Sequence, residues 1–63
     1  MSAPKPPITE RTYAAAMLRM RIAYLRARRL YWERQGVAGE DAAQADARDA
    51  DALERVAAWI EAL

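Results

Sequence analysis

The sequence predicts an all-α protein, an antiparallel hairpin of two helices. Apolar side chains recur every three or four residues from Tyr13 to Trp32, which is the spacing of a helix and not the alternation of a strand. The two glycines, Gly36 and Gly39, bracket a four-residue segment near the middle of the chain. Because connectors this short favour antiparallel neighbours, the helical segments on either side are expected to fold back on each other.

The chain begins with a segment that is not expected to join the hairpin. Residues 1–8 contain three prolines and no periodic apolar residues, which is typical of an extended, disordered tail. Thr9 is a good N-cap, and Glu10 places a negative charge in the first helical turn. The first helix is therefore predicted over 9–35.

The connector and the second helix follow from helix-end chemistry. Gly36 is suited to the left-handed residue that closes a helix C-terminus, so 36–39 is predicted as the connector. Glu40 and Asp41 then place acids at the positive end of a second helix, predicted over 40–62. The hairpin as a whole spans 9–63.

The composition restricts both the core and the chemistry. Hydrophobic residues are 54% of the 63 residues, but 16 of them are alanine, so the chain has little large apolar material for a core. Cysteine and histidine are absent, which removes disulfides, the common zinc and copper sites and the usual nucleophiles and bases. We therefore expect no enzyme activity, no cofactor and no small-molecule substrate. Small domains without such staples commonly depend on a partner subunit.

The charges are divided between the two helices. The net charge is +1, but 9–35 carries seven arginines and two acids, a balance of +5, whereas 40–63 carries two arginines and seven acids, a balance of −5. Opposite charges of this size favour pairing of the two helices. Asp46 and Asp49 are expected to lie level with 26–29 of an antiparallel partner, where each either pairs with arginine or remains solvated.

The first helix has more apolar surface than the second can cover. One stripe has heptad spacing and the other is interrupted by Arg29. The first stripe is Tyr13, Met17, Met20, Tyr24, Ala27 and Tyr31, and the second is Leu18, Ile22, Leu25 and Trp32. The second helix is predicted to offer one modest face, Ala45, Ala52, Leu53, Val56, Ile60 and Leu63, with Trp59 at its edge. Since leaving Leu, Ile and Trp in water forgoes about 1.5–3 kcal/mol per side chain, a second interface is expected.

These features favour a non-enzymatic protein-interaction module. The partner is either another copy, which would complete a four-helix bundle, or a groove on a larger protein that the hairpin joins as a structural or adaptor subunit. The predicted interface residues are Tyr13, Met17, Leu18, Met20, Ile22, Tyr24, Leu25, Tyr31 and Trp32. A short chain rich in alanine and arginine suits a component of a phage or another mobile element. The absence of a signal-peptide pattern predicts a cytoplasmic location, or one within a phage particle.

The arginine-rich helix also suggests an alternative function. In a hairpin dimer that binds RNA or DNA, arginines would clamp phosphates and aromatic rings would stack on unpaired bases. The candidate contacts are Arg19, Arg21, Arg26, Arg28 and Arg29. Binding to a membrane surface is not expected, because the arginines separate two apolar faces instead of forming one polar face.

Overall fold

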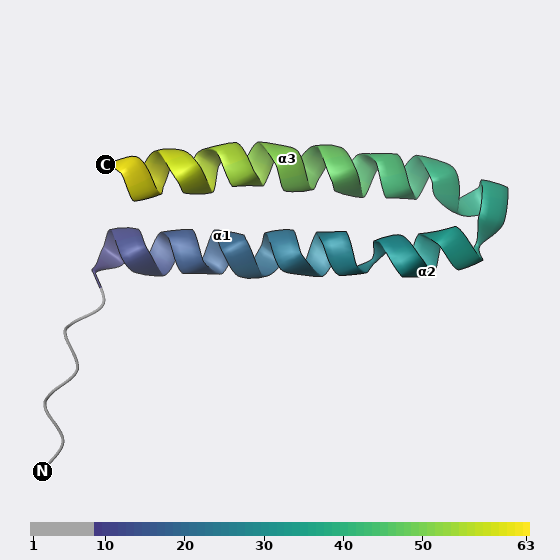
Figure 1. Ribbon diagram of the computed structural model, residues 1–63, viewed down its shortest axis with the longest axis horizontal. Coiled ribbons are helices and arrows are strands. Elements are labelled where there is room, and N and C mark those ends of the chain that lie inside the picture. The colour runs from purple at the N-terminus through teal and green to yellow at the C-terminus, as the bar shows by residue number, and fades with distance from the viewer. Residues whose placement is uncertain (1–8) are drawn as a thin grey trace, which may run out of the picture.

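The predicted hairpin is the observed fold. The computed structural model describes residues 9–63, and the proline-rich tail expected over 1–8 lies outside the described residues. The described chain forms helices α1 (Glu10–Ala27) and α2 (Arg29–Arg34), a 3-10 turn η1 (Gly36–Gly39) and helix α3 (Glu40–Ala62). α1 and α2 form one arm and α3 returns beside them, so that Thr9 and Leu63 lie at the same end (Figure 1). The all-α hairpin fold is confirmed.

Thr9 caps the start of α1. Its backbone is extended, and its side-chain oxygen accepts a hydrogen bond from the backbone N–H of Thr12 at 3.1 Å. This bond satisfies one of the amides that the first turn of a helix leaves without a partner. Glu10 adds negative charge at the same end, so both sequence features act where the helix begins.

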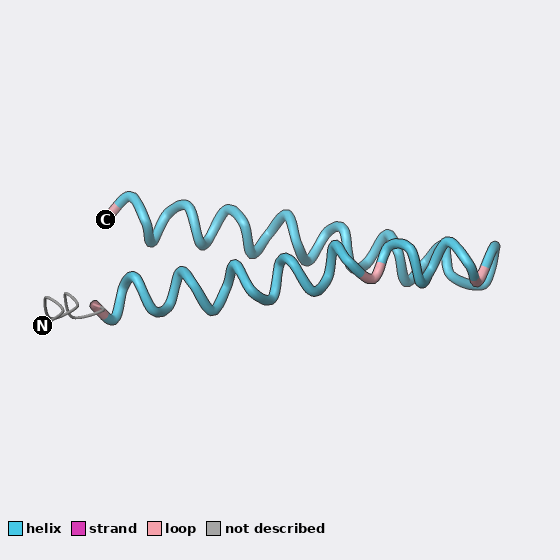
Figure 2. Tube along the Cα trace, turned by 60° about the horizontal axis from the view of Figure 1, so that its bottom comes forward, coloured by secondary structure: helices cyan, strands magenta, loops and turns pink. Residues whose placement is uncertain are grey.

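The first arm is interrupted at Arg28, which the sequence does not predict (Figure 2). The backbone N–H of Arg28 still donates to the Tyr24 carbonyl at 3.2 Å, and that of Trp32 donates to the Arg28 carbonyl at 3.0 Å. The interruption is therefore a local distortion of a continuous arm. Neither glycine nor proline lies near this point, so the usual sequence signals of a kink are missing.

The two glycines make a tight connector for different reasons. Gly36 has φ of +63°, the left-handed conformation that other residues adopt only at a cost. Gly39 is buried against α2, where a Cβ atom would overlap the Trp32 carbonyl oxygen and lie 3.1 Å from the Gln35 Cβ. The connector can approach α2 this closely because Gly39 has no side chain.

The core uses one stripe of α1. Ile22 and Leu25 are buried against Ala50 and Ala57 of α3, with Leu18 and Leu53 packed beside them. The stripe with Leu, Ile and Trp is thus the one that α3 covers. Within residues 9–63, Ile22 and Leu25 are the only buried large apolar side chains.

α3 is rotated relative to the face predicted for it. Leu53 and Ile60 point inward as expected, but Ala45, Ala52, Val56 and Leu63 are exposed, and Ala50 and Ala57 take their place in the core. The inner face of α3 was predicted from the positions of its large apolar side chains. The bulky stripe on α1 instead packs against small residues, which allow the two helix axes to approach.

Candidate protein-interaction surface

α1 carries an exposed apolar seam that the hairpin does not cover. We call it the outer seam of α1, and it consists of Tyr13, Met17, Met20, Tyr24, Ala27 and Tyr31. All six residues are exposed; Met20 has 67% of its surface accessible and Tyr24 has 53%. The spacing alternates between four and three residues, which keeps the side chains on one face of the helix. A second helix laid along this face would therefore meet apolar side chains over almost three heptads.

α3 carries a corresponding seam that sequence reasoning missed. The outer seam of α3 consists of Ala45, Asp49, Ala52, Val56, Trp59 and Leu63, again spaced by alternate steps of four and three. All six residues are exposed, and Trp59 has 64% of its surface accessible. The same spacing rule that identified the seam on α1 could have found this one. It was hidden because Leu53 and Ile60, which belong to the buried face, were assigned to the same stripe.

Ion pairs close one edge of the hairpin. The Nη2 of Arg19 donates to the Oε1 of Glu61 at 2.6 Å, and the Nη2 of Arg26 is hydrogen-bonded to the Oε2 of Glu54. The side chains remain about half exposed, so these pairs fix the register of the helices more than they stabilise them. Arg19 is level with Glu61 and Arg26 with Glu54, which defines an antiparallel register along the whole hairpin.

The same ion pairs lower the pKa values of the two glutamates. The hydrogen bond from Arg26, together with its positive charge, lowers the pKa of Glu54 below its ordinary value. The hydrogen bond from Arg19 likewise lowers the pKa of Glu61. Both carboxylates are therefore held in their charged form to more acidic pH than a free glutamate.

A polar cluster joins α2 to α3 near the connector. The Nε1 of Trp32 donates to the Oδ2 of Asp46 at 2.8 Å, and the Nε of Arg28 lies 3.3 Å from the same oxygen. The guanidinium of Arg28 also lies 4.9 Å from the centre of the Trp32 ring. Asp46 has only 15% of its side chain exposed. Of the two states expected for this acid, paired with arginine or solvated, the structure shows the pair, with Arg28. Asp49 takes part in none of the ion pairs found within residues 9–63.

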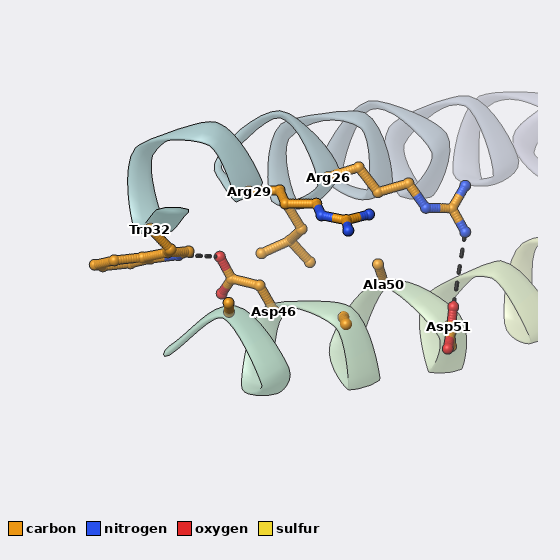
Figure 3. A pocket seen from close by; sticks show the side chains of 9 residues that line it. Arg26, Arg29, Trp32, Asp46, Ala50 and Asp51 are labelled. Atoms are coloured by element: carbon orange, nitrogen blue, oxygen red, sulfur yellow. Dashed lines mark hydrogen bonds and ion pairs between the residues drawn. The ribbon is translucent and has the colours of Figure 1, made fainter. Parts of the chain in front are cut away.

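A groove of about 340 Å³ lies beside this cluster (Figure 3). Arg26 and Arg29 come from the first arm, Asp46 and Asp51 from α3, and Ala50 lies between them. Arg26 is 3.8 Å from Asp51, and Asp46 is already bonded to Trp32. Arg29 pairs with Glu33, so each of the four charged side chains that line the groove already has a partner within the hairpin.

Most of the candidate nucleic-acid contacts are also occupied. Arg19, Arg26 and Arg28 pair with acids of α3, and Arg29 pairs with Glu33 at 3.1 Å. Arg21 instead lies over the ring of Tyr24, with its guanidinium 5.1 Å from the ring centre. The structure thus distributes the five arginines around the arm instead of gathering them into one patch.

The predicted interface residues divide into two groups. Leu18, Ile22 and Leu25 pack inside the hairpin, and Trp32 is half-buried against α3. The remaining five residues, Tyr13, Met17, Met20, Tyr24 and Tyr31, are exposed in the outer seam of α1. The surface open to a partner is therefore the stripe of tyrosine and methionine.

Residues 9–63 contain neither a cluster of metal ligands nor a membrane-spanning helix. No three acidic side chains there come close enough to hold a metal ion. No helix in this part of the chain is long and apolar enough to cross a membrane. Comparisons with protein families, with curated proteins and with solved structures give no match to this chain.

Proposed function

We propose that this protein is a non-enzymatic interaction module, a structural or adaptor subunit that associates through the outer seam of α1. One observation carries the proposal: in residues 9–63, ten large apolar side chains are exposed while only two, Ile22 and Leu25, are buried. Exposed apolar residues scattered singly are normal on a protein surface, but eight of these ten lie at heptad spacing in the outer seams of α1 and α3. Burial of that pattern by another helix is the simplest source of the stabilisation that the small core lacks.

The test is a matched pair of lysine substitutions. Met20→Lys places a charge in the outer seam of α1, whereas Ala58→Lys places the same charge at an exposed position outside both outer seams. Helix content is followed by circular dichroism and mass by sedimentation equilibrium. We expect Ala58→Lys to behave as the parent protein and Met20→Lys to weaken association about 10–100-fold, the equivalent of one large buried side chain. A parent chain that is a folded monomer at high concentration would refute association with itself.

The alternative is an RNA- or DNA-binding hairpin dimer. It is supported by Arg21, which takes part in none of the ion pairs described within residues 9–63 and whose guanidinium lies over the Tyr24 ring. It has less support than protein association, because Arg19, Arg26 and Arg28 already pair with acids of α3. Sedimentation with a short single-stranded RNA and a DNA duplex, at low and moderate salt, separates the two functions. Salt-sensitive complexes of defined size would favour nucleic-acid binding.

A further inference from the structure

We propose that the occupant of the outer seam of α1 is the outer seam of α3 from another copy of this chain, in a closed ring of at least three hairpins with every connector at one end. This inference rests on the proposed function and specifies its partner and geometry. Three observations support it, namely the register of the two seams, their charges and the angles at which they project from each hairpin.

The register follows from symmetry. Copies related by rotation about an axis parallel to the helices are not displaced along that axis, so contacts between copies keep the register seen within the hairpin. The ion pairs fix that register, with Arg19 level with Glu61 and Arg26 level with Glu54. Extending it to the outer seams brings Met20 level with Trp59 and Ala27 level with Ala52.

The sizes of the side chains agree with this pairing. Small residues meet where Ala27 is level with Ala52, so the helices can approach closely at that layer. Large residues meet further along, where Met20 is level with Trp59 and Tyr24 with Val56. Methionine is flexible enough to fill the space beside an indole ring. In this register five layers of each seam pair, from Met17 level with Leu63 to Tyr31 level with Asp49, and Tyr13 and Ala45 lie beyond the ends of the contact.

Charge selects α3 over α1 as the partner helix. The segment 9–35 carries +5, so packing α1 against α1 of another copy brings two strongly basic helices together. The segment 40–63 carries −5, so α1 against α3 brings opposite charges together. Arg28 and Tyr31 of α1 border the layer in which Asp49 of the next copy would lie. Asp49, which takes part in none of the ion pairs described within the hairpin, would thereby gain a basic neighbour.

The angles between seams indicate how many copies close the ring. With heptad geometry, the buried and outer seams are separated by about 150° around α1 and about 100° around α3. A closed ring of two hairpins requires these angles to total about 180°, a ring of three about 240° and a ring of four about 270°. The total of about 250° that this geometry gives is far from the value for two hairpins and fits three or four copies.

The residues between the seams also favour a ring of more than two hairpins. On α1, Arg21 and Arg28 lie between the buried and the outer seam, on the side that would face the centre of the assembly. In a ring of two hairpins these arginines would enter a dry core, where an incompletely paired charge costs several kcal/mol. A larger ring leaves a central channel in which water can solvate them.

Cysteine cross-linking tests the pairing, since the chain has no cysteine of its own. Ala27→Cys and Ala52→Cys change exposed alanines that the proposed contact places side by side. They lie on outer faces of different helices, so a short bis-maleimide cannot join them within one hairpin. We expect the double variant to yield covalent dimers, trimers and closed rings, whereas Ala27→Cys alone yields almost no cross-linked product. The control double variant, Ala27→Cys with Ala58→Cys, has its second thiol outside both seams and should also remain uncross-linked.

Light scattering on the unmodified chain completes the test. With 7.1 kDa per chain, three or four copies give about 21 or about 28 kDa. A dimer that cross-links through Ala27→Cys alone would overturn this inference while leaving the proposed function intact. A dimer that cross-links between positions 27 and 52 would overturn the number of copies in the ring. A folded monomer, or a chain that is unfolded alone, would overturn the inference, and the folded monomer would also remove self-association from the proposed function.

Discussion

Gly39→Ala is expected to destabilise the hairpin, although alanine is the better helix former. The added Cβ would overlap the Trp32 carbonyl oxygen and lie 3.0 Å from the carbonyl carbon, which is backbone and cannot rotate away. The connector must therefore shift from α2. Since the connector also begins α3, this shift strains the hydrogen bond between Trp32 and Asp46.

The magnitude follows from three contributions. Relieving an overlap in a packed region costs about 1–3 kcal/mol, and weakening one hydrogen bond costs about 0.5–1.5 kcal/mol. Replacing glycine reduces the conformational entropy of the unfolded chain, which stabilises the folded state by about 0.4–1 kcal/mol. The net expectation is a loss of about 2 kcal/mol. For a domain of this size that loss lowers Tm by roughly 8–16 °C.

Gly36→Ala provides the matched control. It also places alanine in the connector, but nothing lies within 4 Å of the added Cβ, and the cost is the left-handed backbone at φ of +63°. That cost is about 1 kcal/mol. Urea unfolding followed by circular dichroism at one fixed protein concentration measures both variants. If Gly39→Ala were as stable as Gly36→Ala or more so, the close approach of the connector to α2 would be refuted.

Three further predictions concern the contacts between the arms. Asp46→Ala leaves the part-buried Trp32 N–H without an acceptor and should cost about 1–3 kcal/mol in urea unfolding, whereas Asp46→Asn keeps an acceptor and should cost less; equal losses would contradict this assignment. Because the pKa values of Glu54 and Glu61 are lowered in the folded state, their contribution is present above the ordinary glutamate pKa and is lost as pH falls through the lowered values. Acid titration of Tm should therefore show a smaller decline for Glu61→Gln than for the parent, and an unchanged curve would argue against the pair with Arg19. Leu25→Ala should destabilise by about 2–5 kcal/mol and Leu30→Ala by under 0.5 kcal/mol in thermal melts, because Leu25 is 4% exposed and Leu30 is 67% exposed.

The elements of the fold could be predicted from the sequence because their signals are local. Thr9 caps α1 through a bond to a residue three positions away, and Gly36 adopts the left-handed conformation within its own backbone. The interruption at Arg28 has no such local signal. Its side chain pairs with Asp46, a residue 18 positions further along the chain. The sequence of the first arm alone cannot predict a contact with a residue on the other arm.

The surface could be predicted in part. The heptad seam on α1 was apparent because its tyrosines and methionines are large, while the seam on α3 was merged with the buried face because both contain apolar residues at helical spacing. Alanine accounts for the error. Ala50 and Ala57 are too small to stand out in an apolar pattern, yet they are the α3 residues that are buried in the core.

The sequence by itself determined that the chain forms two helices, that the first has two apolar stripes and that their charges are opposite. Periodicity, caps and charge are properties of each segment, and they need no partner to be recognised. The tertiary structure decided which stripe is buried. α3 presents alanines to Leu18, Ile22 and Leu25, and the same rotation brings Glu54 and Glu61 to Arg26 and Arg19. Close packing and ion pairing select this one rotation together, and they leave the tyrosines and methionines of α1 on the surface.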